Sequence, residues 1–406
     1  MYDYYSEKEQ IKEQILNEID YSKDLSEEEL IDVIDKIIVL QKNKNYIEIA
    51  EREALRKEVF YAMRRWDIIQ ELMEDPEVTE IMVNGLEHIF IEKKGSICCY
   101  HKKFNSLKTL HHVIQQMAAG CNRIVNESSP ILDARLSDGS RVNIVLGSVA
   151  LNGPVITIRR FPGQPITMDD LIRYQAISQE VCEWLKDLVS AGYNILVSGG
   201  TGSGKTTFLN VLSGFIPSQE RIITIEDNAE LQIKSIPNLV KLEVRNANVE
   251  GCKEITIRDL IKTSLRMRPD RVVIGEVRGA EAIDLLQALN TGHKGSMSTV
   301  HANSAKDSIS RLETMVLMGM ELPLNAIRRQ IAAGIDIIIH LGRLRDRSRR
   351  VLEIAEVKDY IEGEVNLNTI YRFIEDGVTE KNVVSGKLQK EGHLIHEEKL
   401  KEMGIK

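Results

Sequence analysis

The apolar residues of the first 65 positions follow a helical spacing. Residues 7–63 contain neither proline nor glycine, and one apolar stripe consists of Ile11, Ile15, Leu16 and Ile19. Spacings of three and four residues predict amphipathic helices. Ser26 and Glu29 resemble a capping box at the start of one of them. We therefore predict a helical segment over residues 1–65, either a solvent-facing layer or a docking arm for a partner.

From Asp75 onward the apolar runs are short and are separated by turn residues. They begin at Val78, His88, Asp133 and Val155. Such runs predict strands, and residues 107–119 have the spacing of a helix. The combination predicts a small α+β domain over residues 66–161. The sequence Pro-Gly-Gln-Pro at 162–165 is typical of a hinge, so we interpret residues 162–178 as a linker to the next domain.

Strand-like and helical patterns alternate in the second half of the chain. The strand-like runs are residues 193–197, 221–225, 239–244, 271–274, 296–300 and 335–340, and the helical stretches are residues 168–189, 257–267, 280–289, 305–317 and 325–333. The alternation predicts a largely parallel sheet with helices on both faces over residues 179–345. Residues 346–406 are expected to form a hairpin near Glu362 and a polar tail, which carries no recognisable motif from Lys381 onward.

One glycine-rich loop carries the clearest chemistry. Residues 199–206 fit the G-x-x-x-x-G-K-[ST] pattern between a strand-like run and a helical segment. Glycines let successive backbone N–H groups point inward around anionic oxygens, and the following helix adds the positive end of its dipole. A flexible loop before a helix is the alternative, and the agreement of pattern and context disfavours it. We predict a nucleotide site formed by Gly199, Gly200, Thr201, Gly202, Ser203, Gly204, Lys205, Thr206 and Thr207.

Further candidates follow the later strand-like runs: Glu226, Asp227, Glu276 and His301. Ligands of open α/β sheets collect at the edge where the carboxyl ends of parallel strands meet. We predict that Glu276 orients the attacking water and that His301 senses the γ-phosphate. Glu226 and Asp227 are predicted to assist in placing metal or water. Taken singly, each has an ordinary alternative, because a carboxylate in this position often caps the next helix and a histidine is often structural.

The ligands that this arrangement predicts are a nucleotide with a triphosphate and Mg²⁺. Lys205 places a compact positive charge near the β- and γ-phosphates, and the hydroxyl of Thr206 is a natural Mg²⁺ ligand. Gly275 stands where many P-loop enzymes carry an aspartate linked to the metal. We therefore expect Thr206 and Glu226, together with water, to hold Mg²⁺.

The composition narrows the class of protein. A net charge of −8, with 43% hydrophobic and 28% charged residues, is typical of an acidic globular protein and disfavours nonspecific nucleic-acid binding. No apolar run approaches the ~18 residues that span a membrane, and the first residues do not resemble a secretory signal. The cysteines form no C-x-x-C pair and predict neither a zinc ribbon nor a disulfide framework; they are Cys98, Cys99, Cys121, Cys182 and Cys252. We therefore expect a cytoplasmic protein with reduced thiols.

As a set, these motifs resemble the secretion-superfamily ATPases of type II and type IV secretion systems and type IV pili. In the terms of that family, residues 199–206 are the Walker A motif, 225–230 the Asp box, 271–278 an atypical Walker B motif and 292–303 the His box. The similarity is strongest to the CpaF-like branch, which serves Tad/Flp pili. It is carried by residues 75–85, 127–142, 266–270 and 315–323.

The resemblance implies an α/β fold with a RecA-like P-loop core, an N-terminal α+β (PAS-like) domain and, here, an extra helical segment. It also implies a homohexamer in which arginines of the N-terminal domain approach the nucleotide. By position the arginine candidates are Arg141 and Arg159, then Arg135 and Arg160, with Arg266 and Arg278 also expected near the nucleotide. The alternative is that Arg135 and Arg141 form surface ion pairs. Their partners would be Asp133 and Asp138.

The function that follows from the resemblance is that of a Mg²⁺-dependent ATPase motor. Its expected partners are other copies of itself and an inner-membrane platform protein, with no nucleic acid and no direct membrane insertion. We expect it in the cytoplasm, recruited to the inner face of the membrane. A nucleotide-dependent regulatory switch is one alternative, and a nucleic-acid translocase on the same core is another. The acidic charge balance disfavours the translocase.

Overall fold

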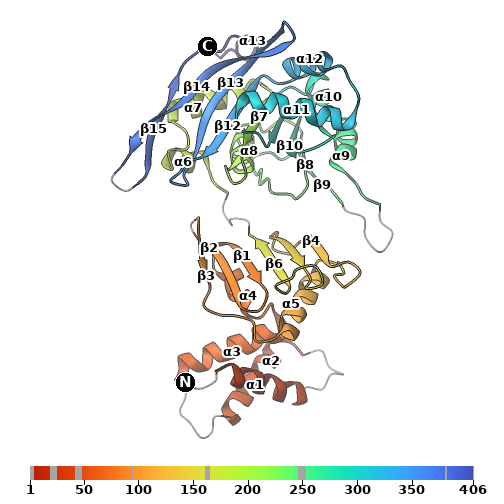
Figure 1. The fold of residues 1–406 in the computed structure, drawn as a ribbon, viewed down its shortest axis with the longest axis vertical. Coiled ribbons are helices and arrows are strands. Elements are labelled where there is room, and N and C mark those ends of the chain that lie inside the picture. Colours follow the sequence, from red (N-terminus) through yellow and green to blue (C-terminus); the bar gives the residue numbers. More distant parts are fainter. Residues whose placement is uncertain are drawn as a thin grey trace. The chain divides into compact units, whose positions relative to one another are not determined.

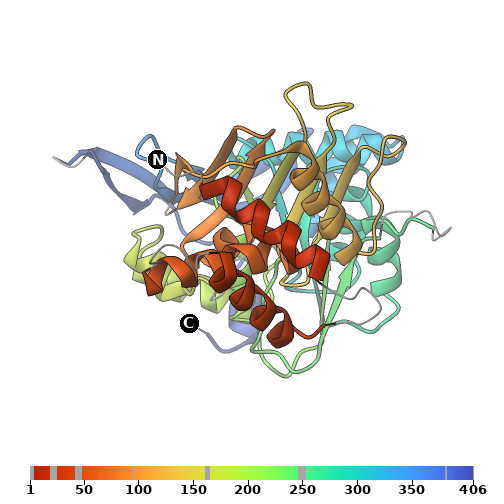
Figure 2. The same cartoon turned by 90° about the horizontal axis from the view of Figure 1, so that it is seen from below.

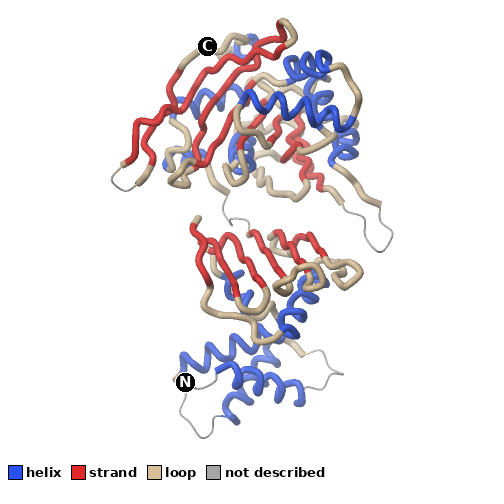
Figure 3. Tube along the Cα trace, in the orientation of Figure 1, coloured by secondary structure: helices blue, strands red, loops and turns tan. Residues whose placement is uncertain are grey.

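The computed structural model describes residues 4–18, 25–41, 48–93, 95–160, 165–245, 253–379 and 382–405. The chain divides into two compact units, Met1–Gly163 and Gln164–Lys406. Figure 1 and Figure 3 show that each unit contains its own sheet. Residues 162–164 of the predicted hinge lie outside the described residues.

The first unit begins with three helices that pack together, drawn in red to orange in Figure 2. They are α1 (Tyr4–Glu18), α2 (Glu27–Gln41) and α3 (Ile49–Arg64), so the helical prediction is confirmed. The predicted capping box forms at α2, where the N–H of Glu29 donates to Ser26 Oγ at 3.2 Å and the N–H of Ser26 to Glu29 Oε2 at 2.8 Å. Ile11 and Ile15 are fully buried. The side chain of Leu16 and the whole of Ile19 lie outside the described residues.

An antiparallel sheet follows in the same unit. Its elements are α4 (Ile68–Glu74), β1 (Val78–Asn84), β2 (His88–Lys93), β3 (Ser96–Cys99), α5 (Leu107–Gly120), β4 (Ile131–Arg135), β5 (Arg141–Val145) and β6 (Val155–Arg159). The strand order is β3-β2-β1-β6-β5-β4. Lys102 joins this part to the helices, since its Nζ lies 2.9 Å from carboxylate oxygens of Glu58 on α3 and Glu71 on α4. The α+β prediction is confirmed, and the exposed edge strand β3 is an addition that the pattern did not predict.

The second unit contains a nine-stranded sheet. Its elements are α6 (Met168–Arg173), α7 (Gln179–Ser190), β7 (Ile195–Gly199), α8 (Lys205–Ser213), β8 (Ile222–Glu226), β9 (Leu239–Glu243), α9 (Ile257–Ser264), β10 (Arg271–Val277), α10 (Ala282–Asn290), β11 (Met297–Val300), α11 (Ala305–Gly319), α12 (Leu324–Gly334), β12 (Ile337–Arg343), β13 (Arg349–Ile361), β14 (Glu364–Val378), β15 (Val384–Lys390) and α13 (Glu398–Glu402). The order is β15-β14-β13-β12-β7-β11-β10-β8-β9. Strands β12 to β9 in this order are parallel, and β13, β14 and β15 extend the sheet in antiparallel fashion.

The parallel strands are buried on both faces, as expected for strands between two helix layers. On β7, Ile195 and Val197 pack into a core with α7 and α8, whereas Leu196 packs into a second core with α9 to α12. The predicted parallel sheet with helices on both faces is therefore confirmed. Because the strands are parallel, β7, β8, β10 and β11 all end at the same edge of the sheet, which is where the candidate residues lie.

The C-terminal tail is part of the folded second unit, which its sequence did not indicate. The carboxylate of the buried Glu356 accepts hydrogen bonds from the backbone N–H groups of Ile395 at 2.9 Å and His396 at 2.7 Å. Lys399 on α13 lies 2.5 Å from Asp336. In the part of the chain that the structure describes, no helix has the length and apolar content to cross a membrane.

Candidate active site

The glycine-rich loop joins β7 to α8 at the carboxyl edge of the sheet. Gly199, the last residue of β7, has φ +154°, and a Cβ there would lie 2.5 Å from the carbonyl oxygen of Leu341 on β12. Gly204 caps α8 with φ +94°. A side chain is strained in the backbone conformation of either residue, so the glycines of the pattern are required by geometry.

The loop carbonyl of Gly200 accepts hydrogen bonds from two side chains. Lys205 Nζ donates to it at 3.0 Å, and Ser203 Oγ donates to it at 2.9 Å. Both donors are buried. Burial lowers the pKa of Lys205, and the carboxylate of Glu276 acts in the opposite direction. Thr201 is exposed, while Thr206 and Thr207 are partly exposed in the first turn of α8.

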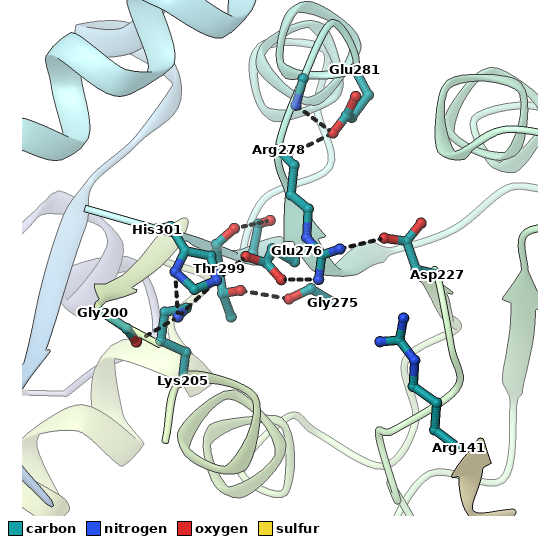
Figure 4. A network of polar contacts seen from close by, with 12 residues as sticks. Arg141, Gly200, Lys205, Asp227, Gly275, Glu276, Arg278, Glu281, Thr299 and His301 are labelled. Carbon is teal, nitrogen blue, oxygen red and sulfur yellow. Dashed lines mark hydrogen bonds and ion pairs between the residues drawn. The ribbon is translucent and has the colours of Figure 1, made fainter. Parts of the chain in front are cut away.

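Lys205, His301 and Glu276 meet in one chain of polar contacts, shown in Figure 4. Lys205 Nζ lies 3.3 Å from His301 Nδ1, and His301 Nε2 lies 2.7 Å from Glu276 Oε1. The pKa of His301 is lowered by burial, while Glu276 raises it. The predicted lysine, histidine and carboxylate therefore converge, although they come from α8, from the residue after β11 and from β10.

Arg278 ties two predicted carboxylates together. Its guanidinium lies 2.6 Å from Glu276 Oε2 and 3.4 Å from Asp227 Oδ2. Its backbone N–H donates to Glu281 at 2.7 Å, which fixes the turn after β10. In this structure, therefore, Arg278 holds carboxylates from the ends of two strands.

Glu226 is the most deeply buried of the predicted carboxylates. Its Oε1 accepts hydrogen bonds from the N–H groups of Glu230 at 2.9 Å and Leu231 at 3.0 Å, while its buried Oε2 has no hydrogen-bond partner among the described residues. Burial raises the pKa of Glu226 to about 7. A Cβ at Gly275 would lie 3.0 Å from Glu226 Cγ. The glycine at 275 thus leaves room for the side chain of Glu226.

Three of the four arginine candidates of the first unit make side-chain contacts within that unit. Arg141 forms a bidentate pair with Asp133 at 3.1 and 2.6 Å, as the surface-pair alternative predicted. Arg135 Nε donates to the carbonyl of Gly139 at 3.2 Å. Arg160 donates to backbone carbonyls, those of Val78 at 3.0 Å and Leu72 at 3.3 Å, which gives it a structural role.

Two further arginine candidates are exposed. Arg159 lies at the end of β6, where the register places it beside Arg141 and Glu80. Arg266 follows the end of α9 in the second unit.

Two of the predicted residues, Thr206 and Glu226, carry oxygen donors of the kind that Mg²⁺ binds. Among the described residues no group of three or more His, Cys, Asp or Glu side chains could hold a metal ion. The hydroxyl of Thr206 and the unpartnered Oε2 of Glu226 are oxygen donors of the kind Mg²⁺ prefers. A few protein oxygens suffice for Mg²⁺, because phosphates and water complete its octahedron.

One contact to the loop comes from a residue that the motifs did not indicate. Arg349, the first residue of β13, donates from Nε to the carbonyl oxygen of Gly202 at 2.9 Å. The signal in the sequence was the arginine-rich run at 343–350, Arg-Leu-Arg-Asp-Arg-Ser-Arg-Arg. Its meaning depended on β12 pairing with β7, which brings the start of β13 to the loop.

The fold and the loop define a RecA-like P-loop protein. The chain belongs to the family of type II/IV secretion system proteins, whose family model matches residues 64–385. A Mycobacterium tuberculosis protein named for conjugal transfer is 36% identical over 312 residues, which cover 75% of this chain and 87% of that protein. The type IV secretion system protein PtlH of Bordetella pertussis is 33% identical over 304 residues, which cover 68% of this chain and 90% of that protein.

A solved structure supports the fold independently. The ATPase DotB of Legionella pneumophila matches with a TM-score of 0.51 and 20% identity, over 73% of this chain and 80% of that chain. The predicted family and fold class are therefore confirmed. The CpaF-like branch stays a prediction.

Proposed function

We propose that this chain is a Mg²⁺-dependent ATPase that hydrolyses ATP at the 199–207 loop and drives a secretion or pilus system. The observation that carries the proposal is the meeting of Lys205, His301 and Glu276 at the carboxyl edge of the sheet, through contacts of 3.3 and 2.7 Å. Membership of the type II/IV secretion family supports the same activity. A phosphate-binding loop alone binds nucleotide, and the neighbouring carboxylate and imidazole add the means to hydrolyse it.

In the proposed mechanism, Lys205 exchanges its contacts with Gly200 and His301 for the β- and γ-phosphates, which are stronger acceptors. Glu276 orients the attacking water and takes its proton. His301 contacts both Lys205 and Glu276. Its position therefore depends on whether Lys205 is engaged with phosphates. Thr206 and Glu226 would hold Mg²⁺, which would neutralise negative charge on the phosphates when bound. Asp227 assists the placement of water.

The remaining parts of the proposal concern assembly. We propose a homohexamer in which the first unit closes over the nucleotide about the 162–165 hinge, and in which Arg141 and Arg159 complete the site. For this, Arg141 must exchange Asp133 for phosphate. The closing movement would act on an inner-membrane platform protein of a Tad/Flp-type pilus, with conjugal transfer or type IV secretion as the alternative system. Particle mass measured with and without ATP tests the hexamer. Neighbouring genes for a pilin, a prepilin peptidase and two platform-like proteins would support the Tad assignment.

The decisive experiment is a steady-state phosphate-release assay on the folded chain with ATP and Mg²⁺. Lys205→Ala and Glu276→Gln are expected to lower turnover by at least about a hundredfold. Lys387→Ala and Glu321→Gln remove exposed groups outside the site and are the matched controls. Turnover by both site variants at the parent rate would overturn the proposal. A parent that binds ATP without releasing phosphate would indicate a regulatory switch, and turnover that depends on DNA would indicate a translocase.

A further inference from the structure

The outer side of the phosphate loop is held by a residue far away in the sequence. Arg349 Nε donates to the carbonyl oxygen of Gly202 at 2.9 Å. Gly202 lies in the middle of the loop with φ +70°. Among the hydrogen bonds of the described residues, the carbonyl oxygen of Gly202 accepts one from Arg349 and no other. The side chain of Arg349 is exposed, so this contact is not required to fill the core.

Because a peptide is planar, the contact that fixes the Gly202 carbonyl also fixes the direction of the Ser203 N–H. In a trans peptide the C=O of Gly202 and the N–H of Ser203 point in opposite directions. With the Gly202 carbonyl held by Arg349, the N–H of Ser203 points to the side of Lys205, because it meets at 3.3 Å the same Gly200 oxygen that accepts from Lys205 Nζ; this side is called inward below. Glycine at 202 makes rotation of this peptide inexpensive, because no Cβ opposes it. A rotated peptide would present its oxygen to the anionic phosphates in place of a donor.

The frame that carries Arg349 is firmly anchored. The next residue, Arg350, is buried and donates to the carbonyl of Gln175 at 2.5 Å and to that of Val384 at 3.1 Å. The N–H of Val351 donates to Ala176 O at 2.9 Å. The start of β13 is therefore fixed to the turn after α6 and to β15, and Arg349 reaches the loop from a rigid base.

We propose that Arg349 is a positioning residue that sets the affinity for nucleotide by holding the Gly202–Ser203 peptide with its N–H inward. This inference rests on the proposed function of the loop. Arg349 acts through the loop carbonyl and takes no part in bond cleavage. Its replacement therefore weakens binding of ATP and of non-hydrolysable analogues, while saturated turnover is preserved.

The same hairpin supplies a matched control. Arg343 pairs with Arg349 in the β12–β13 register, and it makes no side-chain hydrogen bond or ion pair within the described residues. Arg343→Met removes one positive charge from the same hairpin without removing the contact to Gly202. A general electrostatic attraction for ATP would be weakened equally by Arg343→Met and Arg349→Met. A positioning role would be weakened only by Arg349→Met.

The experiment measures the dissociation constant of a fluorescent ATP analogue and the KM and kcat for ATP, on the full chain. We expect Arg349→Met to raise the dissociation constant and KM about five- to twentyfold, as for loss of one charge-assisted hydrogen bond, with kcat changed less than about twofold. Arg343→Met should change each value less than about twofold. Arg349→Gln, which keeps a donor, should fall between the parent and Arg349→Met.

Two results would overturn the inference while leaving the proposed function intact. In the first, the parent binds and hydrolyses ATP, and the Arg349→Met variant binds ATP as tightly as the parent does. The other is an equal loss of affinity in Arg343→Met and Arg349→Met. A parent that binds no ATP would overturn the proposed function and this inference together. A thermal midpoint of Arg349→Met equal to that of the parent shows that a change in affinity does not arise from misfolding.

Discussion

The Nε2 atom of His301 lies 2.7 Å from Oε1 of Glu276, and the same imidazole touches Nζ of Lys205 through Nδ1. One ring therefore stands between the cation of the phosphate loop and the carboxylate proposed to act on water. His301 is held from two sides, which makes it sensitive to any change at either neighbour. A bound triphosphate would draw Lys205 away and leave the pair of His301 and Glu276.

Replacing His301 should slow the hydrolysis of ATP without weakening the binding of ATP to the same extent. His301→Ala removes the group that positions Glu276, so kcat should fall about ten- to a hundredfold, while the dissociation constant for ATP changes less. His293→Ala is the control, because His293 lies in the same 292–303 segment and its ring lies near Thr291 and the α10 carbonyl of Ala288 instead of Lys205 and Glu276. Steady-state kinetics with a binding assay measure both quantities. Equal kcat values for the two variants would argue against a role for His301.

The buried carboxyl of Glu226 should make stability depend on pH. Its pKa is raised from 4.5 to about 7 in the folded chain, so the folded state holds an extra proton between these values. The free energy of unfolding should therefore fall as pH rises from about 4.5 to 7, by about 3 kcal/mol at most. Glu226→Gln should remove this part of the slope and stabilise the chain at pH 8. The free energy of unfolding is measured with denaturant at several pH values. The same dependence of this free energy on pH in the parent and in Glu226→Gln would contradict the prediction.

Two adjacent glycines should differ sharply in their tolerance of a side chain. Gly199→Ala places a methyl group 2.5 Å from the Leu341 carbonyl oxygen and 2.6 Å from Ser203 Oγ. It should lower the free energy of unfolding by about 2 kcal/mol or more. Gly200→Ala meets no atom within 4 Å and should leave stability nearly unchanged. Thermal unfolding of the two variants provides the comparison. Similar midpoints would mean that the loop adapts to a side chain at 199.

The β12–β13 turn contains a strained residue that can be relieved. Arg347 has φ +67°, a left-handed conformation that costs about 1 kcal/mol for a residue with a Cβ. Arg347→Gly should therefore stabilise the chain by about 0.5 kcal/mol, less than the full strain because glycine also loosens the unfolded state. Arg347→Ala keeps a Cβ and should bring no such gain. Thermal unfolding midpoints distinguish two causes. Relief of backbone strain would raise the midpoint only in Arg347→Gly, whereas loss of the positive charge would change the midpoint of both variants by the same amount.

Local patterns were sufficient wherever the relevant partners lie a few residues apart. In the capping box, Ser26 and Glu29 are three positions apart, and their hydrogen bonds are those of the helix end itself. The phosphate loop is likewise local, since the glycines, Lys205 and the start of α8 form one continuous turn. The alternation of strand-like and helical stretches indicated a parallel sheet, and parallel strands bring Glu226, Glu276 and His301 to one edge.

Contacts between distant segments were decided only by the tertiary structure. The sequence did not indicate that the side chain of Glu226 would pack against Gly275, because this depends on β8 lying beside β10. It did not indicate that Arg349 would hold the phosphate loop, because β12 first had to pair with β7. Nor did the polar tail show that the buried Glu356 would bind its backbone N–H groups. Periodicity records which face of an element is buried, whereas the partner across a sheet depends on strand order and register, which arise from packing the whole core.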